Sequence, residues 1–277
     1  MKLNSLSGKI RDFIKRPKLV KRWKNFLYKR RLRRETYLFN ITGAVSQWQW
    51  GGRSLYASPV DKDGKIWLKK IIERFGFDKF DYIIFAYDDV SFDEDIFRKC
   101  TIVREKGKHF YFLKKYITPS VCSRYDYIFL WCDDIDIVDF DPCAFLKIMQ
   151  TNNLQLAQPA LTPDSYFTWD ITLQDETYKV GRYVDFVEIM LPVFTPQAWE
   201  RFWCMMESDK NYRGWGYDLF ARSVCRYINM GIIDCQPVKH VRPVGQRGSG
   251  AERDKKYIMN KYAAYRLAEK VSYGKLY

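Results

Sequence analysis

Short apolar runs of strand length alternate with segments of helical periodicity along most of this chain. Tyr127–Trp131 is an apolar run, rich in aromatic residues and bounded by polar residues, which is typical of a buried strand. Tyr82–Tyr87 has the same character, whereas Lys65–Phe75 and Pro142–Thr151 have the spacing of helices. Alternation of this kind predicts an α/β domain with a mainly parallel central sheet flanked by helices.

The same patterns predict the other elements of the domain. We expect further strands at Tyr37–Val45, Leu154–Pro159, Tyr183–Thr195 and Ile232–Cys235. We expect further helices at Asp93–Lys99, Pro119–Arg124, Pro196–Ser208, Asp218–Asn229 and Glu252–Lys270. The long polar and aromatic stretch Thr162–Gly181 suits a loop over a site.

The positive charge of the chain is concentrated at its N-terminal end. Residues 1–34 contain fourteen Lys and Arg and a single acid, so about +13 of the formal net charge of +14 lies there. Apolar residues recur at helical spacing on both sides of Pro17, which predicts two short amphipathic helices in an arm over residues 1–35, followed by one domain over 36–277. A basic helix with Trp and Phe on one face suits an anionic membrane surface, although it could equally pack on its own domain or on another subunit.

Composition excludes several other classes of protein. The body is nearly neutral, so a nucleic-acid partner is not favoured, although the arm could bind phosphates. The seven cysteines are scattered without a C-x-x-C pair, which indicates a reducing compartment without a disulfide framework or a cysteine zinc site. No apolar run has the length of a spanning helix or the form of a signal peptide, so we expect a cytoplasmic protein, peripheral on the inner face of the cell membrane.

The strand at Tyr127–Trp131 leads into a cluster of carboxylates. Buried like charges raise one another's pKa and resist desolvation, and a bound cation is the usual remedy. Asp134 and Asp136, in a D-x-D pattern, could share Mg²⁺ or Mn²⁺, although acids after a strand also cap helices. We expect Asp139 and Asp141 to lead into the helix at Pro142, which leaves Asp133, Asp134 and Asp136 as the candidates for chemistry. The cluster comprises Asp133, Asp134, Asp136, Asp139 and Asp141.

Two later features could complete a site. In the segment Gly214–Asp218, Gly216 permits close approach of the backbone, Trp215 offers a flat surface suited to a sugar ring, and Asp218 opens a helix, where it could also be only a cap. His240 could provide a third protein ligand for manganese. We interpret the other histidine, His109, as a core or surface residue.

In this order and spacing, the three features resemble the glycosyltransferase A (GT-A) fold, a Rossmann-type domain. The resemblance implies a nucleotide-sugar donor whose diphosphate is bridged by Mn²⁺ or Mg²⁺ held by Asp134, Asp136 and His240. It also implies that Asp218 accepts the proton of the acceptor hydroxyl.

A closer resemblance covers about Asp81 to Gly245. The segments Tyr125–Trp131, Phe140–Pro142, Gln158–Leu161, Val187–Phe194 and Trp215–Asp218, together with the His240 segment, are similar to the domain of unknown function 707 family. This resemblance draws attention to Asp88 and Glu188 on or near the expected rim of the sheet. Glu188 could be the base in place of Asp218, or it could anchor a neighbouring loop. Gln158 is a candidate sugar contact. Whether Asp133 or Asp136 is the partner of Asp134 stays open.

Together these patterns predict a metal-dependent glycosyltransferase that acts on a surface polysaccharide or lipid-linked glycan. The main alternative is a transferase-like scaffold without turnover, tethered to a membrane by its arm, and a second is a protein that binds nucleic acid through the arm. A metal-dependent phosphoesterase is disfavoured because such sites usually need more histidines than the two of this chain.

Overall fold

The computed structural model describes residues 17–42, 51–207, 209–243 and 249–277. The chain divides into two compact units, Met1–Ala44 and Val45–Tyr277. We describe them separately, and we call the second unit the body.

The described part of the first unit is a single helix, α2 (Pro17–Thr42). Pro17 is its first residue, a position that needs no backbone N–H donor. The helix runs on past residue 35, so the strand predicted at Tyr37–Val45 is wrong over Tyr37–Thr42; a short apolar run does not by itself distinguish strand from helix. The helix predicted before Pro17 lies outside the described residues. Within the described residues, no helix is both long and apolar enough to span a bilayer.

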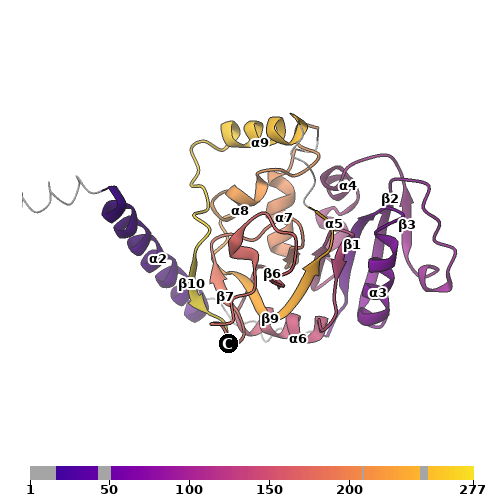
Figure 1. Ribbon diagram of the computed structural model, residues 1–277, viewed down its shortest axis with the longest axis horizontal. Coiled ribbons are helices and arrows are strands. Elements are labelled where there is room, and N and C mark those ends of the chain that lie inside the picture. The colour runs from indigo at the N-terminus through magenta and orange to yellow at the C-terminus, as the bar shows by residue number, and fades with distance from the viewer. Residues whose placement is uncertain (1–16, 43–50, 208, 244–248) are drawn as a thin grey trace, which may run out of the picture. The chain divides into compact units, whose positions relative to one another are not determined.

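The body is built on one mixed, largely parallel sheet (Figure 1). Its strands follow the order β10-β7-β9-β6-β8-β4-β1-β2-β3, and the short β5 pairs with β9. Neighbours in the β4-β1-β2-β3 half are all parallel, while β8 is antiparallel to both β4 and β6. The strands are β1 (Ser54–Val60), β2 (Phe80–Ala86), β3 (Thr101–Arg104), β4 (Tyr127–Leu130), β5 (Ile135–Asp136), β6 (Leu156–Leu161), β7 (Arg182–Val184), β8 (Val193–Phe194), β9 (Met230–His240) and β10 (Ser272–Lys275).

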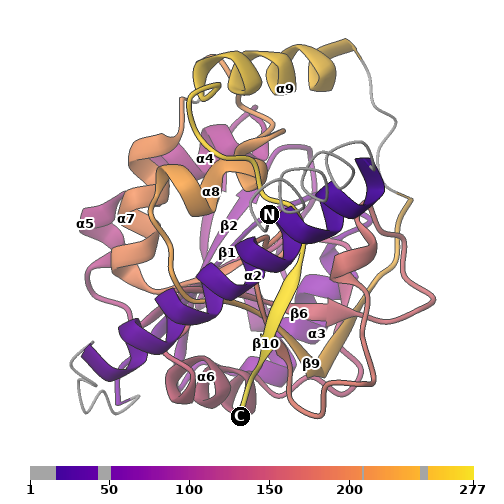
Figure 2. The same cartoon turned by 90° about the vertical axis from the view of Figure 1, so that its left-hand side faces the viewer.

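Helices cover both faces of this sheet (Figures 1 and 2). Successive side chains of β4 alternate between the faces: Ile128 and Leu130 belong to a core shared with α4, α7 and α8, whereas the ring of Phe129 contacts Phe75 of α3 and Phe145 of α6. The helices are α3 (Lys65–Phe75), η1 (Asp95–Phe97), α4 (His109–Tyr116), α5 (Pro119–Cys122), α6 (Pro142–Thr151), η2 (Asp170–Thr172), α7 (Pro196–Met205), α8 (Tyr217–Val224) and α9 (Ser249–Lys261). The predicted α/β class, with a mainly parallel central sheet flanked by helices, is therefore confirmed.

Several boundaries differ from the predictions. The helices at Lys65–Phe75 and Pro142–Thr151 are confirmed to the residue, and Asp141 caps the second through the amide of Cys143. The single strand predicted at Tyr183–Thr195 is instead two short strands, β7 and β8, joined by an irregular segment. The last helix ends at Lys261 rather than Lys270.

Strand β1, fully buried between β2 and β4, was not predicted. It contains Pro59, and proline argues against a central strand because it cannot donate to the ladder. In the body, pairing of β1 with β4 ends at Ala57, so Pro59 has a strand on one side only. The carboxyl ends of β1, β2 and β4 meet at one edge of the sheet, where ligands of α/β domains bind.

Candidate active site

A cavity of about 250 Å³ lies at this edge. Its wall includes Cys132 and Asp134 after β4, residues of the loop after β6, the start of α8, the end of β9 and one face of α9. In both views α9 lies beyond α8 at one end of the body (Figures 1 and 2). Six of the residues predicted for the site line this cavity together: Asp134, Glu188, Trp215, Gly216, Asp218 and His240.

Asp134 and His240 are in direct contact. Antiparallel pairing of β5 with the end of β9 places Ile135 opposite His240, and the Nε2 atom of His240 lies 3.1 Å from Oδ2 of Asp134. Nδ1 of the same ring is 2.7 Å from the carbonyl oxygen of Tyr166. Burial lowers the pKa of His240, but the hydrogen bond and charge of Asp134 outweigh this and raise the pKa above its usual value. Oδ1 of Asp134 is buried and has no hydrogen-bond partner among the described residues.

Arg242 joins three carboxylates next to this pair. Its Nη1 atom is 2.9 Å from Asp61, Nη2 is 2.7 Å from Asp133, and Nε is 3.4 Å from Oδ2 of Asp134. The Asp61 amide donates to the other oxygen of Asp133 at 3.0 Å. Burial holds the pKa of Asp133 at about 7, although that amide and Arg242 favour the ionised form. We call Asp61, Asp133, Asp134 and Arg242 the Arg242 cluster.

Asp136, which the sequence analysis places beside Asp134 as a metal ligand, lies elsewhere. Its carboxylate is 3.5 Å from Nζ of Lys70 on α3, and it lines a separate hollow with that residue. Pairing of Asp136 with Lys239 on β9 puts it beyond the contact between Asp134 and His240. The three predicted metal ligands are therefore not brought together, and the described residues contain no group of three His, Cys, Asp or Glu side chains arranged to hold a metal ion.

Asp88 and Gln158 have structural roles in this site. The carboxylate of Asp88, exposed after β2, accepts hydrogen bonds from the amides of Lys62 and Val90, so it supports its own and a neighbouring loop instead of lining the cavity. Gln158 is fully buried, and its Oε1 accepts the amide of Glu188 at 2.7 Å. It therefore holds the backbone of Glu188 in place and does not line the cavity.

Glu188 and Asp218 are carboxylates at the cavity wall, and neither has a salt-bridge partner within the part of the chain that the structure describes. Burial, followed by the charge of Asp218, raises the pKa of Glu188 to about 8, and its Oε2 atom has no hydrogen-bond partner among the described residues. Burial also raises the pKa of Asp218 to about 7, against a hydrogen bond from the amide of Leu219. Both groups therefore exchange protons near neutral pH, which is the property required of a general base or acid.

The turn before α8 aims Asp218 at the cavity. Gly216 has φ of +92°, a left-handed conformation that an L side chain adopts only with strain, and it forms the N-cap of α8. The fully buried Asn211 fixes the turn by accepting the amide of Gly214 and donating to the carbonyl of Trp215. Tyr217 and Asp218 then start the helix, with Asp218 in its first turn.

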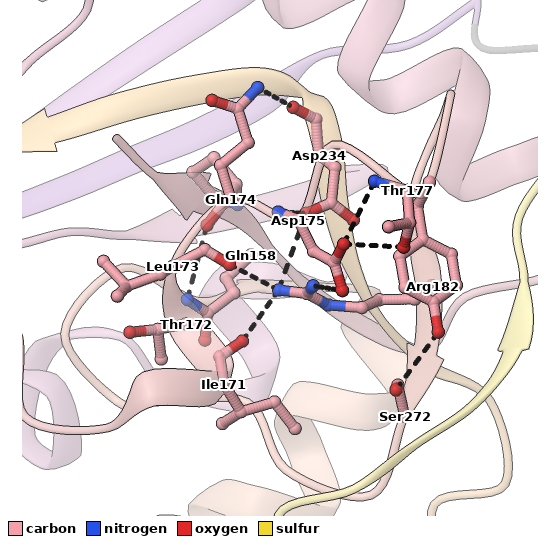
Figure 3. A network of polar contacts seen from close by, with 12 residues as sticks. Gln158, Ile171, Thr172, Leu173, Gln174, Asp175, Thr177, Arg182, Asp234 and Ser272 are labelled. Carbon is pink, nitrogen blue, oxygen red and sulfur yellow. Dashed lines mark hydrogen bonds and ion pairs between the residues drawn. The ribbon is translucent and has the colours of Figure 1, made fainter. Parts of the chain in front are cut away.

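The loop over the site is fastened on both sides of the residues that reach the cavity, Thr168 and Trp169. Before them, the amide of Tyr166 donates to the carbonyl of His240. After them, the buried Arg182 donates to the carbonyls of Ile171 and Leu173 at 2.8 and 2.6 Å, and the same guanidinium contacts the two carboxylates Asp175 and Asp234 (Figure 3). The loop is therefore a fixed wall of the cavity.

The structure adds residues to the site that the sequence analysis missed. His109, expected in the core or on the surface, lines the cavity; burial lowers its pKa to about 4, and its Nε2 atom has no partner among the described residues. Arg213 and Lys255 line the same cavity. Asp61 follows the strand β1, so it could be recognised only once that strand was known. No local pattern marks the other three.

Comparison with protein families gives one match, over residues 34–272, to a family described as "Protein of unknown function (DUF707)". The chain belongs to this family. The matched range begins within α2 and ends at the start of β10, so it includes the whole cavity wall. The predicted family is confirmed, and the match is longer than the resemblance at Asp81–Gly245 that led to it.

A comparison of the DUF707 chain with curated proteins finds no match. The solved structures similar to it include S. aureus TarS 1–349, with a TM-score of 0.44 and 8% identity over 68% of this chain and 60% of that one. They also include A197 from STIV, with a TM-score of 0.37 and 10% identity over 71% of this chain and all of that one. The chain thus spans about 60% of the TarS structure. Similarity at this level extends to neither chemistry nor substrate.

Proposed function

We propose that this protein is a glycosyltransferase that moves a sugar from a nucleotide-sugar donor to a hydroxyl group of a glycan or lipid-linked acceptor. The observation that carries the proposal is the convergence of Asp134, Glu188, Asp218 and His240, from four separate parts of the chain, on one cavity. Aromatic walls with a few polar groups are typical of sites for small organic ligands. Phe110, Trp169 and Trp215 provide these walls.

The size of the cavity suits the reacting part of the donor. At about 250 Å³ it is smaller than the roughly 300–1,000 Å³ of sites that enclose a drug-sized molecule. A sugar ring with its neighbouring phosphate fits this space better than a complete nucleotide sugar does. Arg213 and Lys255 add positive charge to the wall, which favours a ligand that carries phosphate.

Asp134 and His240 lie close enough together to hold a divalent cation, whereas the predicted set also included Asp136, which lies elsewhere. Oδ1 of Asp134, which has no hydrogen-bond partner in the described ranges, and the imidazole in contact with the same carboxylate offer suitable donor atoms. Mg²⁺ is commonly held by one or two carboxylates together with substrate phosphates, so a third protein ligand is not required. Bound there, Mg²⁺ or Mn²⁺ would supply positive charge for the departing nucleoside diphosphate.

Asp218 is our choice for the base. The acceptor oxygen attacks the anomeric carbon, its proton passes to the carboxylate of Asp218, and the bond from the anomeric carbon to the phosphate oxygen breaks with its electron pair leaving on the nucleoside diphosphate. With a pKa of about 7, Asp218 is about half ionised at neutral pH and can accept a proton, whereas at about 8 Glu188 is mostly protonated. Glu188 is thereby suited to donate a hydrogen bond to the substrate.

A thermal-shift screen of nucleotide sugars, with and without Mn²⁺, tests the proposed function. One donor class should raise the melting temperature in the presence of Mn²⁺, since a ligand at about 100 times its Kd adds about 2.7 kcal/mol of stability. Asp134→Ala should abolish that shift, while Asp136→Asn, outside the cavity, should keep it. If no nucleotide sugar shifts the wild type, or if Asp134→Ala responds fully, the proposal is wrong.

Transfer assays separate the two carboxylates. Asp218→Asn should lower the transfer rate by about 10²–10⁴-fold, as expected for loss of a general base, while donor binding is retained. Glu188→Gln should have a smaller effect, because the amide can still donate a hydrogen bond. The reverse order of effects would assign the base to Glu188.

We further propose that the basic arm holds the enzyme at an anionic membrane surface, where a lipid-linked acceptor resides. In α2, nine Lys and Arg lie among apolar residues that include Trp23 and Phe26, whose rings stack at 5.6 Å. Full-length protein should bind vesicles containing anionic lipid, and salt should weaken that binding. Equal binding to neutral vesicles, or binding to DNA alone, would contradict this role.

A further inference from the structure

Arg242 directs every contact that the structure records for its guanidinium to a carboxylate. Nη1 contacts Asp61, Nη2 contacts Asp133, and Nε faces Asp134 at 3.4 Å. The aspartates come from different loops, one after β1 and two after β4, and Arg242 follows the end of β9. Arg182, which fastens a loop, differs in that it also donates to two backbone carbonyls.

The position of Arg242 leaves one carboxylate oxygen of the cluster available. Oδ2 of Asp134 lies 3.1 Å from Nε2 of His240 and 3.4 Å from Nε of Arg242, and the second contact is an ion pair without a hydrogen bond. Oδ1 is buried without a hydrogen-bond partner among the described residues, and Asp134 lines the cavity. The guanidinium therefore forms ion pairs with Asp61 and Asp133, while Oδ1 of Asp134 stays available to bind a ligand.

We infer that Arg242 is a positioning residue that acts as the resident counter-ion of Asp61, Asp133 and Asp134, and that it makes binding of a divalent cation at Asp134 depend on a diphosphate. The second half of this inference rests on the proposed function. The first half concerns the apo protein and stands without it.

The physical reason is the charge of the Arg242 cluster. Without Arg242, the carboxylates of Asp61, Asp133 and Asp134 would leave uncompensated negative charge beside Asp134, and that charge would attract a divalent cation. Arg242 already supplies a positive charge to that position and occupies two of the three carboxylates. A divalent ion at Asp134 would then lie close to a guanidinium of like charge, and the energy of that repulsion is large in a partly buried site. The negative charge of a diphosphate offsets it.

The test measures Mn²⁺ affinity of the full-length protein by titration calorimetry, with inorganic pyrophosphate as the probe. Wild-type protein should bind Mn²⁺ weakly alone and at least tenfold more tightly when pyrophosphate is saturating. Arg242→Gln should bind Mn²⁺ alone at least tenfold more tightly than wild type and gain little from pyrophosphate. Arg242→Lys, which keeps the charge, should restore the weak affinity of the wild type.

A matched control is Arg253→Gln on α9, which removes an exposed guanidinium 3.6 Å from the buried Asp254 and should leave both Mn²⁺ affinities unchanged. If Arg242→Gln binds Mn²⁺ alone no more tightly than wild type, Arg242 is not the counter-ion. If pyrophosphate leaves the Mn²⁺ affinity of the wild type unchanged, the proposed dependence on diphosphate is wrong. This measurement uses only wild-type protein, so it remains a valid test even if Arg242→Gln does not fold. Absence of nucleotide-sugar binding, with both Mn²⁺ results as expected, would refute the proposed function and leave the role of Arg242 intact.

Discussion

Two arginines of the body, Arg182 and Arg242, are each held between aspartates, but their surroundings differ. Arg182 is 4% exposed and contacts two carbonyls as well as Asp175 and Asp234 (Figure 3). The side chain of Arg242 is 32% exposed, and its recorded contacts are all carboxylates at the ligand-binding edge of the sheet. An arginine bound to carbonyls fastens a loop, whereas one surrounded only by carboxylates sets the charge of a site.

Loss of Arg182 should have the largest effect on stability. Arg182→Met removes the ion-pair partner of Asp234, whose side chain is 1% exposed, and the hydrogen-bond donor of two backbone carbonyls. Breaking a buried ion pair in this way costs about 3–5 kcal/mol, so the free energy of unfolding should fall by that amount in urea titrations. Arg253→Met, at an exposed side chain, should cost less than about 0.5 kcal/mol. Equal losses in the two variants would remove the structural role assigned to Arg182.

Glu188 sharpens the comparison because the structure records no salt bridge between it and either arginine. Burial raises its pKa from 4.5 to about 8, so between these values the folded state binds more protons than the unfolded state. The free energy of unfolding contributed by Glu188 therefore falls as the pH rises from about 4.5 to about 8. Glu188→Gln should be more stable than wild type by about 4 kcal/mol at pH 8 and nearly equal to it at pH 4, measured by urea unfolding at both pH values. A pH-independent difference would show that folding does not raise the pKa of Glu188.

Removal of Arg242 should destabilise the fold less than removal of Arg182. Its side chain is one-third exposed, so solvent screens part of the charge of Asp61, Asp133 and Asp134 that Arg242→Gln leaves behind. We expect a loss of about 1 kcal/mol in the free energy of unfolding, larger at low salt than at high salt. A loss as large as that of Arg182→Met, unaffected by salt, would make the Arg242 cluster a structural fastening too.

Asp136 should have the smallest effect, because it belongs to neither cluster. It lies 3.5 Å from Lys70, whose side chain is 46% exposed, and such surface pairs contribute about 0–1 kcal/mol. Asp136→Asn should change the free energy of unfolding by about 0.5 kcal/mol or less and leave Mn²⁺ binding intact. Loss of Mn²⁺ binding in this variant would restore Asp136 to the ligand set predicted from the D-x-D pattern.

The comparison also marks what the sequence can reveal about a site. The chemistry-bearing residue types at Asp134, Glu188, Asp218 and His240 were found from local patterns and family resemblance, and all four line the cavity. Asp88, Gln158 and Asp136 do not line it, and the position of each depends on which backbone amide or side chain lies across a neighbouring loop or helix. Those neighbours are distant in sequence.

The sequence by itself determined the α/β class, the helices Lys65–Phe75 and Pro142–Thr151, the strand before the acid cluster and the family, because periodicity and capping residues act within a few positions of the chain. Only the tertiary structure decided that Asp134 faces His240 while Asp136 faces Lys70, since this depends on the register of β5 with β9. It also decided that Arg242 reaches Asp61 across 181 positions of the chain. Strand order and register arise from packing of the whole body, and they bring together charges that no local pattern connects.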